Sequence, residues 1–323
     1  MLHTASEEDP VVVRGLRKQY GDSHVVRGVD LTIHKGEVFA LLGPNGAGKT
    51  TTVEILEGVR QRTGGDVRVL GCDPADDRRD WRARIGVVPQ STGAYTDLTV
   101  REVVEHFAAL YPAPLPVGQV IDMVGLGKHG KKQTTALSGG QQRRLDVAVG
   151  VVGDPELIFL DEPTTGLDPV ARREAWDLVQ YFADRGRTTV LTTHYLDEAE
   201  ALAQRAAVIV DGKVAEVSRV SELGGRADTS TTVSFRMPPE LAGRTLPALP
   251  AGVTVERDGT NGDAPGIVSI LTRTPTAVLL VLLAWADEAR VRELPELRVH
   301  RPTLEEIYLD LISRNREAKA GTP

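Results

Sequence analysis

The chain has 323 residues, of which 41% are hydrophobic and 26% charged, and its formal net charge is −7. These values fit a globular protein of two domains. The acidic balance argues against nucleic acid as the main partner, because binding to phosphates needs a basic face. The single cysteine, Cys72, has no partner for an internal disulfide and favours a reducing, cytosolic setting.

No segment of the sequence is predicted to enter a membrane. The first ten residues, "MLHTASEEDP", are polar and acidic and lack the apolar segment of a signal peptide. The longest apolar run, "AVLLVLLAWA" at 277–286, is shorter than the roughly 20 residues that a spanning helix needs. We therefore expect any membrane role to depend on a partner chain.

From Val11 to about Val217, short apolar or β-branched runs alternate with helical patterns, which is typical of an α/β sheet. A hairpin is predicted at 206–217, turning at Asp211 and Gly212. The predicted strands before it cover residues 11–16, 37–43, 65–71, 85–89, 157–161 and 188–193.

The pattern changes after a polar, glycine-bearing stretch at 223–229, which predicts a linker and two domains, 1–222 and 223–323. The second domain has predicted strands at 231–237, 253–258, 266–273 and 296–301, and predicted helices at 239–246, 276–289 and 303–318. This βαββαβ order plus a closing helix predicts a small α+β domain of ferredoxin type. Thr303 and Glu306 form a capping box at the start of the closing helix. Its apolar face consists of Leu304, Ile307, Tyr308, Leu311 and Ile312.

The stretch "GPNGAGKT" at 43–50 follows a predicted strand and matches the pattern G-x-x-x-x-G-K-[ST]. Glycines let successive N–H groups converge on phosphate oxygens, and the following helix adds its positive dipole. Lys49 would reach the β- and γ-phosphates, and the Thr50 hydroxyl would hold Mg²⁺. The alternative is a glycine-rich turn with a solvated lysine, but the flanking strand and helix patterns favour a phosphate loop. Its expected nucleotide-binding residues are Gly43, Pro44, Asn45, Gly46, Ala47, Gly48, Lys49, Thr50 and Thr51.

A second motif, "LIFLDEP", places two carboxylates at the end of another predicted strand, at the edge of the sheet where ligands of α/β folds bind. Asp161 suits Mg²⁺, directly or through water, and Glu162 could take a proton from an attacking water. Alone, this pair could equally be a helix N-cap. With the phosphate loop, it indicates a nucleotide-hydrolysing site.

A third motif, "LSGGQQRR" at 137–144, carries a capping box between Ser138 and Gln141. Gly139 and Gly140 leave the N–H groups of the helix start bare, which predicts a second anion site. An ordinary helix cap is the alternative.

Together these motifs resemble the ATP-binding subunit of ABC transporters, over residues 11 to about 220. The resemblance implies a P-loop NTPase cassette with an antiparallel β subdomain and a helical subdomain. It implies ATP and Mg²⁺ as ligands. It also implies a dimer with a second copy of the chain, in which Ser138 and Gly140, within the signature 138–141, contact the nucleotide of the other subunit.

The resemblance assigns further roles residue by residue. Tyr20 matches the aromatic residue that stacks on adenine. Gln90 matches a glutamine that contacts Mg²⁺ and the water and senses the membrane partner. Asp168 in "GLDP" matches the D-loop aspartate, and His194 matches the histidine that bridges the γ-phosphate and the catalytic glutamate. The resemblance thus implies Glu162, His194, Gln90 and Asp168 as catalytic residues.

The stretches "THYLDEAEALA" and "RPTLEEIYLDL" resemble the ABC-2 drug-resistance exporters, similar to daunorubicin/doxorubicin resistance ATPases. This implies an ATPase at the cytoplasmic face of the membrane that powers export of drugs or other hydrophobic compounds. It would bind peripherally to a separately encoded integral membrane permease, and its C-terminal domain would support the dimer or regulate it. An importer, a lipid or polysaccharide exporter, and a non-transport ATPase remain alternatives. The last would need a long coiled coil or a second cassette, and the sequence has neither.

Overall fold

The computed structural model describes residues 9–90, 95, 97–225, 230–258 and 266–320. The chain divides into two compact units, of which the first comprises residues 1–220 and 312–323 and the second residues 221–311. The sequence predicts all of 223–323 in the second domain, whereas the structure groups 312–323 with the first unit. The division falls inside the last helix, α9 (Leu304–Ala320). The helix is continuous there, so the sequence gives no sign of a boundary.

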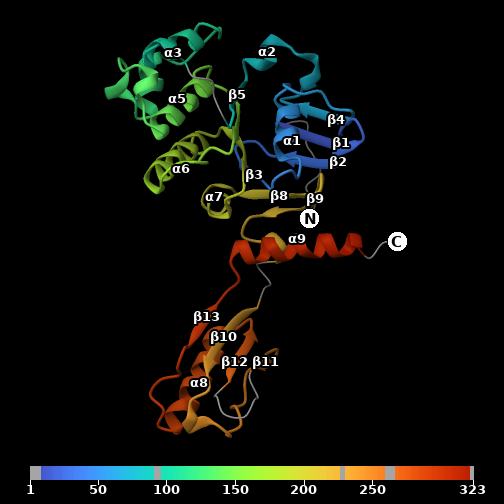
Figure 1. Cartoon of the computed structure of the whole chain (residues 1–323), viewed down its shortest axis with the longest axis vertical. Helices are drawn as coiled ribbons and strands as arrows, with labels where there is room; N and C mark the ends of the chain where they lie inside the picture. The colour runs from blue at the N-terminus through green and yellow to red at the C-terminus, as the bar shows by residue number, and fades with distance from the viewer. Residues whose placement is uncertain (1–8, 91–94, 96, 226–229, 259–265, 321–323) are drawn as a thin grey trace. The chain divides into compact units, whose positions relative to one another are not determined.

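The first unit is built on a six-stranded sheet (Figure 1). Its strands, in spatial order, are β5 (Ile85–Val88), β6 (Leu157–Asp161), β7 (Thr188–Thr193), β3 (Val38–Leu42), β8 (Arg205–Val210) and β9 (Lys213–Arg219). The first five are parallel and β9 is antiparallel. All five residues of β3 are buried, as expected for a central strand covered on both faces. Because the strands are parallel, the loops after β3, β5, β6 and β7 lie at one edge of the sheet.

A second, antiparallel sheet packs against the first within this unit. Its order is β2 (Ser23–Ile33), β1 (Val11–Tyr20) and β4 (Gly64–Val69). Val13 and Val67 share one buried core with Phe39 and Phe159 of the six-stranded sheet. Strand β2 was not predicted from the sequence, because its polar residues and its register shifts against β1 obscure the alternation of a strand.

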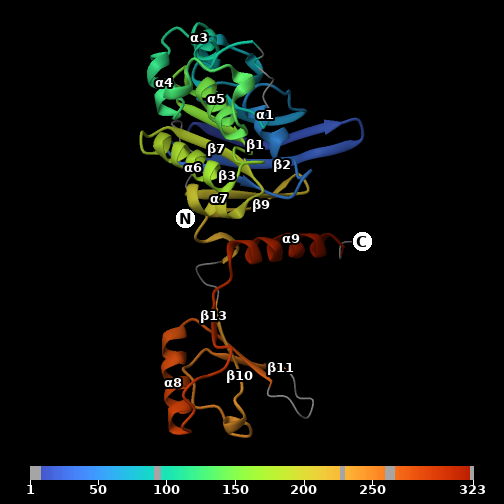
Figure 2. The ribbon, with the colours of Figure 1, turned by 60° about the vertical axis from the view of Figure 1, so that its left-hand side comes forward.

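Three helices of the first unit pack against one another. Figure 2 shows α3 (Val100–Ala108), α4 (Val117–Met123) and α5 (Gly139–Val151) gathered at one end of the first unit. Before residue 220, the described residues also form α1 (Lys49–Leu56), α2 (Arg79–Arg82), α6 (Pro169–Ala183) and α7 (Leu196–Leu202), with single 3-10 turns at Pro74–Asp76, Gly127–His129 and Thr134–Ala136.

The second unit has a four-stranded antiparallel sheet whose core packs against the helix α8 (Pro275–Glu288). The strand order is β11 (Thr254–Asp258), β12 (Ile267–Thr272), β10 (Thr231–Arg236) and β13 (Arg298–His300). Since β12 lies between β10 and β11 and is antiparallel to both, those two strands are parallel and split, as in the expected ferredoxin-type layer.

The predicted helix at 239–246 is wrong. The structure has only a 3-10 turn, Pro239–Leu241, preceded by Pro238 and followed by Gly243 at φ +89°, a left-handed conformation that an α-helix does not accept. The start of the predicted linker forms a 3-10 turn at Leu223–Gly225. Its residues 226–229 and the predicted loop 259–265 lie outside the described residues.

Candidate active site

The phosphate loop connects β3 to α1 and depends on two glycines for its path. A Cβ added to Gly43 would lie 2.3 Å from the carbonyl oxygen of Ile209, and one added to Gly48 would lie 2.8 Å from that of Val25. Gly48 also has φ +99°, in the left-handed region that side chains rarely adopt. The loop therefore fits between β8 and β2 only with glycine at these positions.

Lys49, the first residue of α1, is folded back over this loop. Its Nζ donates to the carbonyl oxygens of Gly43 at 2.8 Å and Pro44 at 3.2 Å, and the residue is only 6% exposed. Burial lowers the pKa of Lys49, while the charges of Glu162 and Asp161 raise it. The ammonium group thus lies within the electrostatic reach of both carboxylates that the sequence singles out.

A pocket of about 350 Å³ opens beside the loop, in the range typical of small-molecule sites. Its lining joins the start of α1 to residues that follow β5, β6 and β7, although these segments are far apart in the chain. The lining residues are Val25, Asn45, Gly46, Gly48, Lys49, Thr50, Thr51, Gln90, Glu162 and His194. The structure thus brings Gln90, Glu162 and His194 together at the phosphate loop. Tyr20, Asp161, Asp168 and the signature residues 138–141 are outside this lining.

Both carboxylate oxygens of Glu162 have partners in the pocket. Oε2 accepts hydrogen bonds from Gln90 Nε2 at 2.9 Å and Thr165 Oγ1 at 3.0 Å. Oε1 lies 3.2 Å from His194 Nδ1. The backbone at Glu162 has φ +45°, a strained conformation for a side-chain-bearing residue that is common at functional sites. Its N–H donates to Thr192 at both the hydroxyl, 3.0 Å, and the carbonyl, 3.1 Å, which holds that conformation.

Asp161 lies behind Glu162, at the last position of β6, and is 8% exposed. It accepts a hydrogen bond from the Thr192 hydroxyl. Burial raises the pKa of Asp161, as does the charge of Glu162, against the hydrogen bond from Thr192 and the charge of Lys49, which lower it. Sequence reasoning missed Thr192 and Thr165, because nothing in "TTVLTT" or "DEPTTG" shows which hydroxyl turns toward the carboxylates.

The residues expected to hold Mg²⁺ offer the donor atoms that this ion prefers. Thr50, Gln90 and Asp161 supply hydroxyl, amide and carboxylate oxygens, and the first two line the pocket. Among the described residues, no cluster of three or more His, Cys, Asp or Glu side chains is arranged to hold a metal.

The signature motif begins α5. Ser138 is its N-cap, and the capping box is complete: Gln141 N donates to Ser138 Oγ at 3.3 Å, and Ser138 N donates to Gln141 Oε1 at 3.1 Å. Ser138 and Gly139 are exposed, and a Cβ added to Gly139 would meet no atom within 4 Å. The start of α5 is therefore exposed to solvent at these two residues.

The two remaining predicted residues lie on other elements. Asp168 caps α6, where its Oδ1 accepts from the N–H groups of Val170 at 2.9 Å and Ala171 at 3.0 Å. Tyr20, the last residue of β1, is 40% exposed. The Lys18 ammonium and the Arg60 guanidinium lie 4.8 and 5.4 Å from its ring centre.

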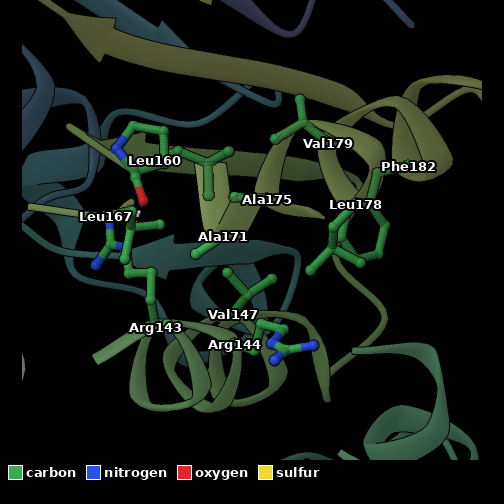
Figure 3. Close-up of a pocket in the computed structure, with 12 residues that line it drawn as sticks. Arg143, Arg144, Val147, Leu160, Leu167, Ala171, Ala175, Leu178, Val179 and Phe182 are labelled. Carbon is green, nitrogen blue, oxygen red and sulfur yellow. Dashed lines mark hydrogen bonds between the residues drawn. The ribbon is translucent and has the colours of Figure 1, made fainter. Parts of the chain in front are cut away.

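A second, apolar cavity lies between α5 and α6 (Figure 3). Val147 of α5 faces Ala171 and Ala175 of α6 across it, and Arg143 of α5 is also part of its lining. Its volume of about 20 Å³ has room for about one water molecule, so it is not a site for a nucleotide.

None of the helices in the described ranges is both long and apolar enough to cross a membrane. Residues 26–165 match the family of ABC transporters, and residues 231–303 match the C-terminal domain of ABC transporter domain-containing protein-like proteins.

Several relatives match nearly the whole chain. The Daunorubicin resistance ATP-binding protein DrrA3 of Streptomyces coeruleorubidus is 36% identical over 320 residues, which cover 96% of this chain and 98% of that protein. The Nod factor export ATP-binding protein I of Paraburkholderia xenovorans is 36% identical over 310 residues, covering 93% and 95%. A solved ATP-binding cassette, a dimer in a post-hydrolysis state bound to ADP and Pi, superimposes with a TM-score of 0.59 at 25% identity, covering 65% of this chain and 98% of its own.

Proposed function

This chain belongs to the ABC transporter family, in the drug-resistance branch, and we propose that it powers export of drugs or other hydrophobic compounds through a separately encoded membrane permease. It is an ATP-binding, ATP-hydrolysing subunit. Export is supported by the names of the relatives that match over most of its length, one for daunorubicin resistance and the other for Nod factor export. The chain would act at the cytoplasmic face of the membrane, held there by the permease.

The pocket suggests how hydrolysis proceeds. The phosphates of ATP would lie along the N–H groups of residues 45–51, with the Lys49 ammonium turned from the loop carbonyls to the β- and γ-phosphates. Glu162 would accept the proton of the attacking water, while Gln90 and His194 orient its carboxylate and the water. A bound Mg²⁺, held by Thr50, Asp161 and Gln90, would neutralise charge on the phosphates.

A complete site would require a second copy of this chain. The residues Ser138 and Gly140 are not part of the pocket lining in their own chain, and the bare start of α5 suits a γ-phosphate held by a partner. Dimeric solved cassettes support this arrangement. Two ATP molecules would then lie between the subunits, with Asp168 at the contact and Tyr20 stacked on adenine.

The observation that carries the proposal is the position of Glu162, held by Gln90 and His194 in the pocket that the phosphate loop lines. The test is to express the chain with its co-encoded permease in a drug-sensitive bacterium and to follow efflux of a fluorescent hydrophobic drug. Efflux should need both proteins and should be lost with Glu162→Gln. Uptake in place of efflux would point to an importer, and no dependence on the permease would contradict a transport role.

A further inference from the structure

Arg143 lies in α5, one turn after the signature motif, and makes three hydrogen bonds to backbone carbonyls outside its own helix. Nε donates to Pro163 at 2.9 Å, Nη1 to Pro89 at 2.6 Å and Nη2 to Asp161 at 3.0 Å. The residue is only 9% exposed. Figure 3 shows the side chain of Arg143 directed away from the helix. One buried guanidinium therefore joins α5 to the segments at the ends of β5 and β6, at the edge of the sheet that carries the phosphate loop.

The three carbonyls flank residues that we place in hydrolysis. Pro89 directly precedes Gln90, while Asp161 and Pro163 stand immediately before and after Glu162. The strained backbone at Glu162, with φ +45°, is thus held from both sides by one side chain. The Gln90–Glu162 hydrogen bond of 2.9 Å joins the two segments that Arg143 fixes.

The shape of the guanidinium matters here. Its N–H groups lie in one rigid plane and point in different directions, so one arginine can donate to three separate carbonyls. The compact ammonium of a lysine cannot reach all three. The buried charge has a counterion in Asp146, whose carboxylate lies 3.9 Å from Nη1. The site is therefore built for arginine and not simply for a positive charge.

We propose that Arg143 is a positioning residue for ATP hydrolysis: it sets the distance between Gln90 and Glu162 by fixing the backbone beside each. The proposal depends on the hydrolytic roles proposed above for those two residues. Because Arg143 and Ser138 lie on the same helix, a shift of α5 on contact with the nucleotide of a partner would reach Gln90 and Glu162 of its own subunit.

The test compares Arg143→Lys and Arg143→Gln with wild type in the full chain, with Glu162→Gln measured in parallel. Arg205→Lys is the matched control. Arg205 also donates to a backbone carbonyl, that of Thr32 at 3.3 Å, and is paired with Glu37 at 2.9 Å, but it lies at the opposite edge of the sheet. The measurements are the Kd of a fluorescent ATP analogue, kcat and KM for ATP, thermal unfolding, and hydrogen exchange of peptides that contain residues 85–90 and 160–165.

We expect both Arg143 variants to bind the nucleotide within about threefold of wild type and to lose at least about tenfold in kcat with KM little changed, as for loss of an interaction made in the transition state. Exchange should rise in the two peptides. The control should change neither kcat nor those peptides, even if it lowers the unfolding temperature equally.

A kcat of Arg143→Gln within twofold of wild type, while Glu162→Gln is inactive, would overturn the positioning role and leave the proposed function standing. Equal activity of Glu162→Gln and wild type would instead contradict the proposed role of Glu162 in hydrolysis, on which the role of Arg143 depends. If Arg143→Lys and Arg143→Gln both fail to fold, the proposal also fails, because the arginine would then be needed for the core and not for the site.

Discussion

Gln90 donates its side-chain amide to the carboxylate of Glu162 over 2.9 Å, although 72 residues separate the two in the chain. Their closeness follows from the register of neighbouring strands. Val88 of β5 pairs with Leu160 of β6, and the strands are parallel, so Gln90 and Glu162 lie equally far beyond the last pair. Any change in the pairing of these two strands would therefore separate the glutamine from the carboxylate.

Glu162→Gln should keep ATP binding and lower hydrolysis by about 10²- to 10⁴-fold, the usual contribution of a general base. An amide preserves the size of the side chain but cannot accept the proton of the water. Steady-state turnover and the Kd for ATP check both parts, and the variant should accumulate as a dimer on size-exclusion chromatography. Glu156→Gln is the control, since Glu156 directly precedes the first residue of the same strand, at the end far from Glu162, and is paired with Arg84. Turnover of Glu162→Gln within threefold of wild type would exclude Glu162 as the base.

Lys49→Ala should abolish ATP binding, because it removes the cation that the loop presents to the β- and γ-phosphates. Ser138→Arg should spare binding and block hydrolysis, since Ser138 would act on the nucleotide of the partner. Equilibrium binding and turnover of the purified variants check both expectations.

Mixing these two variants tests whether the site is shared between subunits. In the mixed dimer, one composite site would be intact and the other would carry both changes. We expect the equimolar mixture to recover ATPase activity above either parent. If the activity of the mixture stays at the level of the parents, a dimer with shared sites in which one intact site is enough for turnover is contradicted.

Glu57 should make stability fall as the pH rises. Burial, with the nearby charges of Asp161 and Glu54, raises the pKa of Glu57 from 4.5 to about 7. The native state then binds more protons than the unfolded state between these values, so the free energy of unfolding decreases from pH 4.5 to pH 7. Glu57→Gln should remove this slope and stabilise the protein at pH 8 by about 3 kcal/mol.

Urea unfolding of wild type and Glu57→Gln at pH 5 and pH 8, without nucleotide or Mg²⁺, measures this difference. Glu105→Gln is the control, because Glu105 is exposed and paired with Arg101 at the helix surface. A stability difference between wild type and Glu57→Gln that is the same at both pH values would show that Glu57 titrates normally.

A chain that ends at residue 220 should fold and bind ATP, because every residue proposed to hold phosphate or Mg²⁺ precedes that point. We expect it to dimerise more weakly than the full chain in the absence of nucleotide. A chain that ends at residue 311 separates loss of 312–323, which group with the first unit, from loss of the second unit. Identical monomer–dimer equilibria for all three chains in the analytical ultracentrifuge would assign the C-terminal part a role other than dimerisation.

The sequence predicts the parts of the site that are local in the chain. The phosphate loop is one such part, because its glycines, Lys49 and Thr50 are contiguous and their spacing carries the chemistry. Gln90 and His194 could be assigned only by resemblance, since a lone glutamine or histidine at a strand end carries no distinctive pattern. Their roles remain predictions.

Contacts that depend on tertiary packing could not be predicted. The hydroxyl of Thr192 and the guanidinium of Arg143 reach the catalytic edge only once β7 and α5 are in place. In the second unit, the apolar spacing at 239–246 predicts a helix, but Gly243 adopts a left-handed conformation and only a single 3-10 turn forms there. The strand order β11-β12-β10-β13 fits the predicted order of elements because it follows from connection rules and not from any one residue.

The placement of β3 has a consequence for synthesis on the ribosome. Both neighbours of this strand, β7 and β8, come from residues 188–210, so the apolar segment "VFALL" leaves the ribosome long before either neighbour exists. At 5–20 residues per second, this delay is on the order of 10 to 30 s. During that time an unpaired, fully apolar strand is open to association with other nascent chains, and a chaperone that covers the N-terminal segment would raise the yield of folded protein.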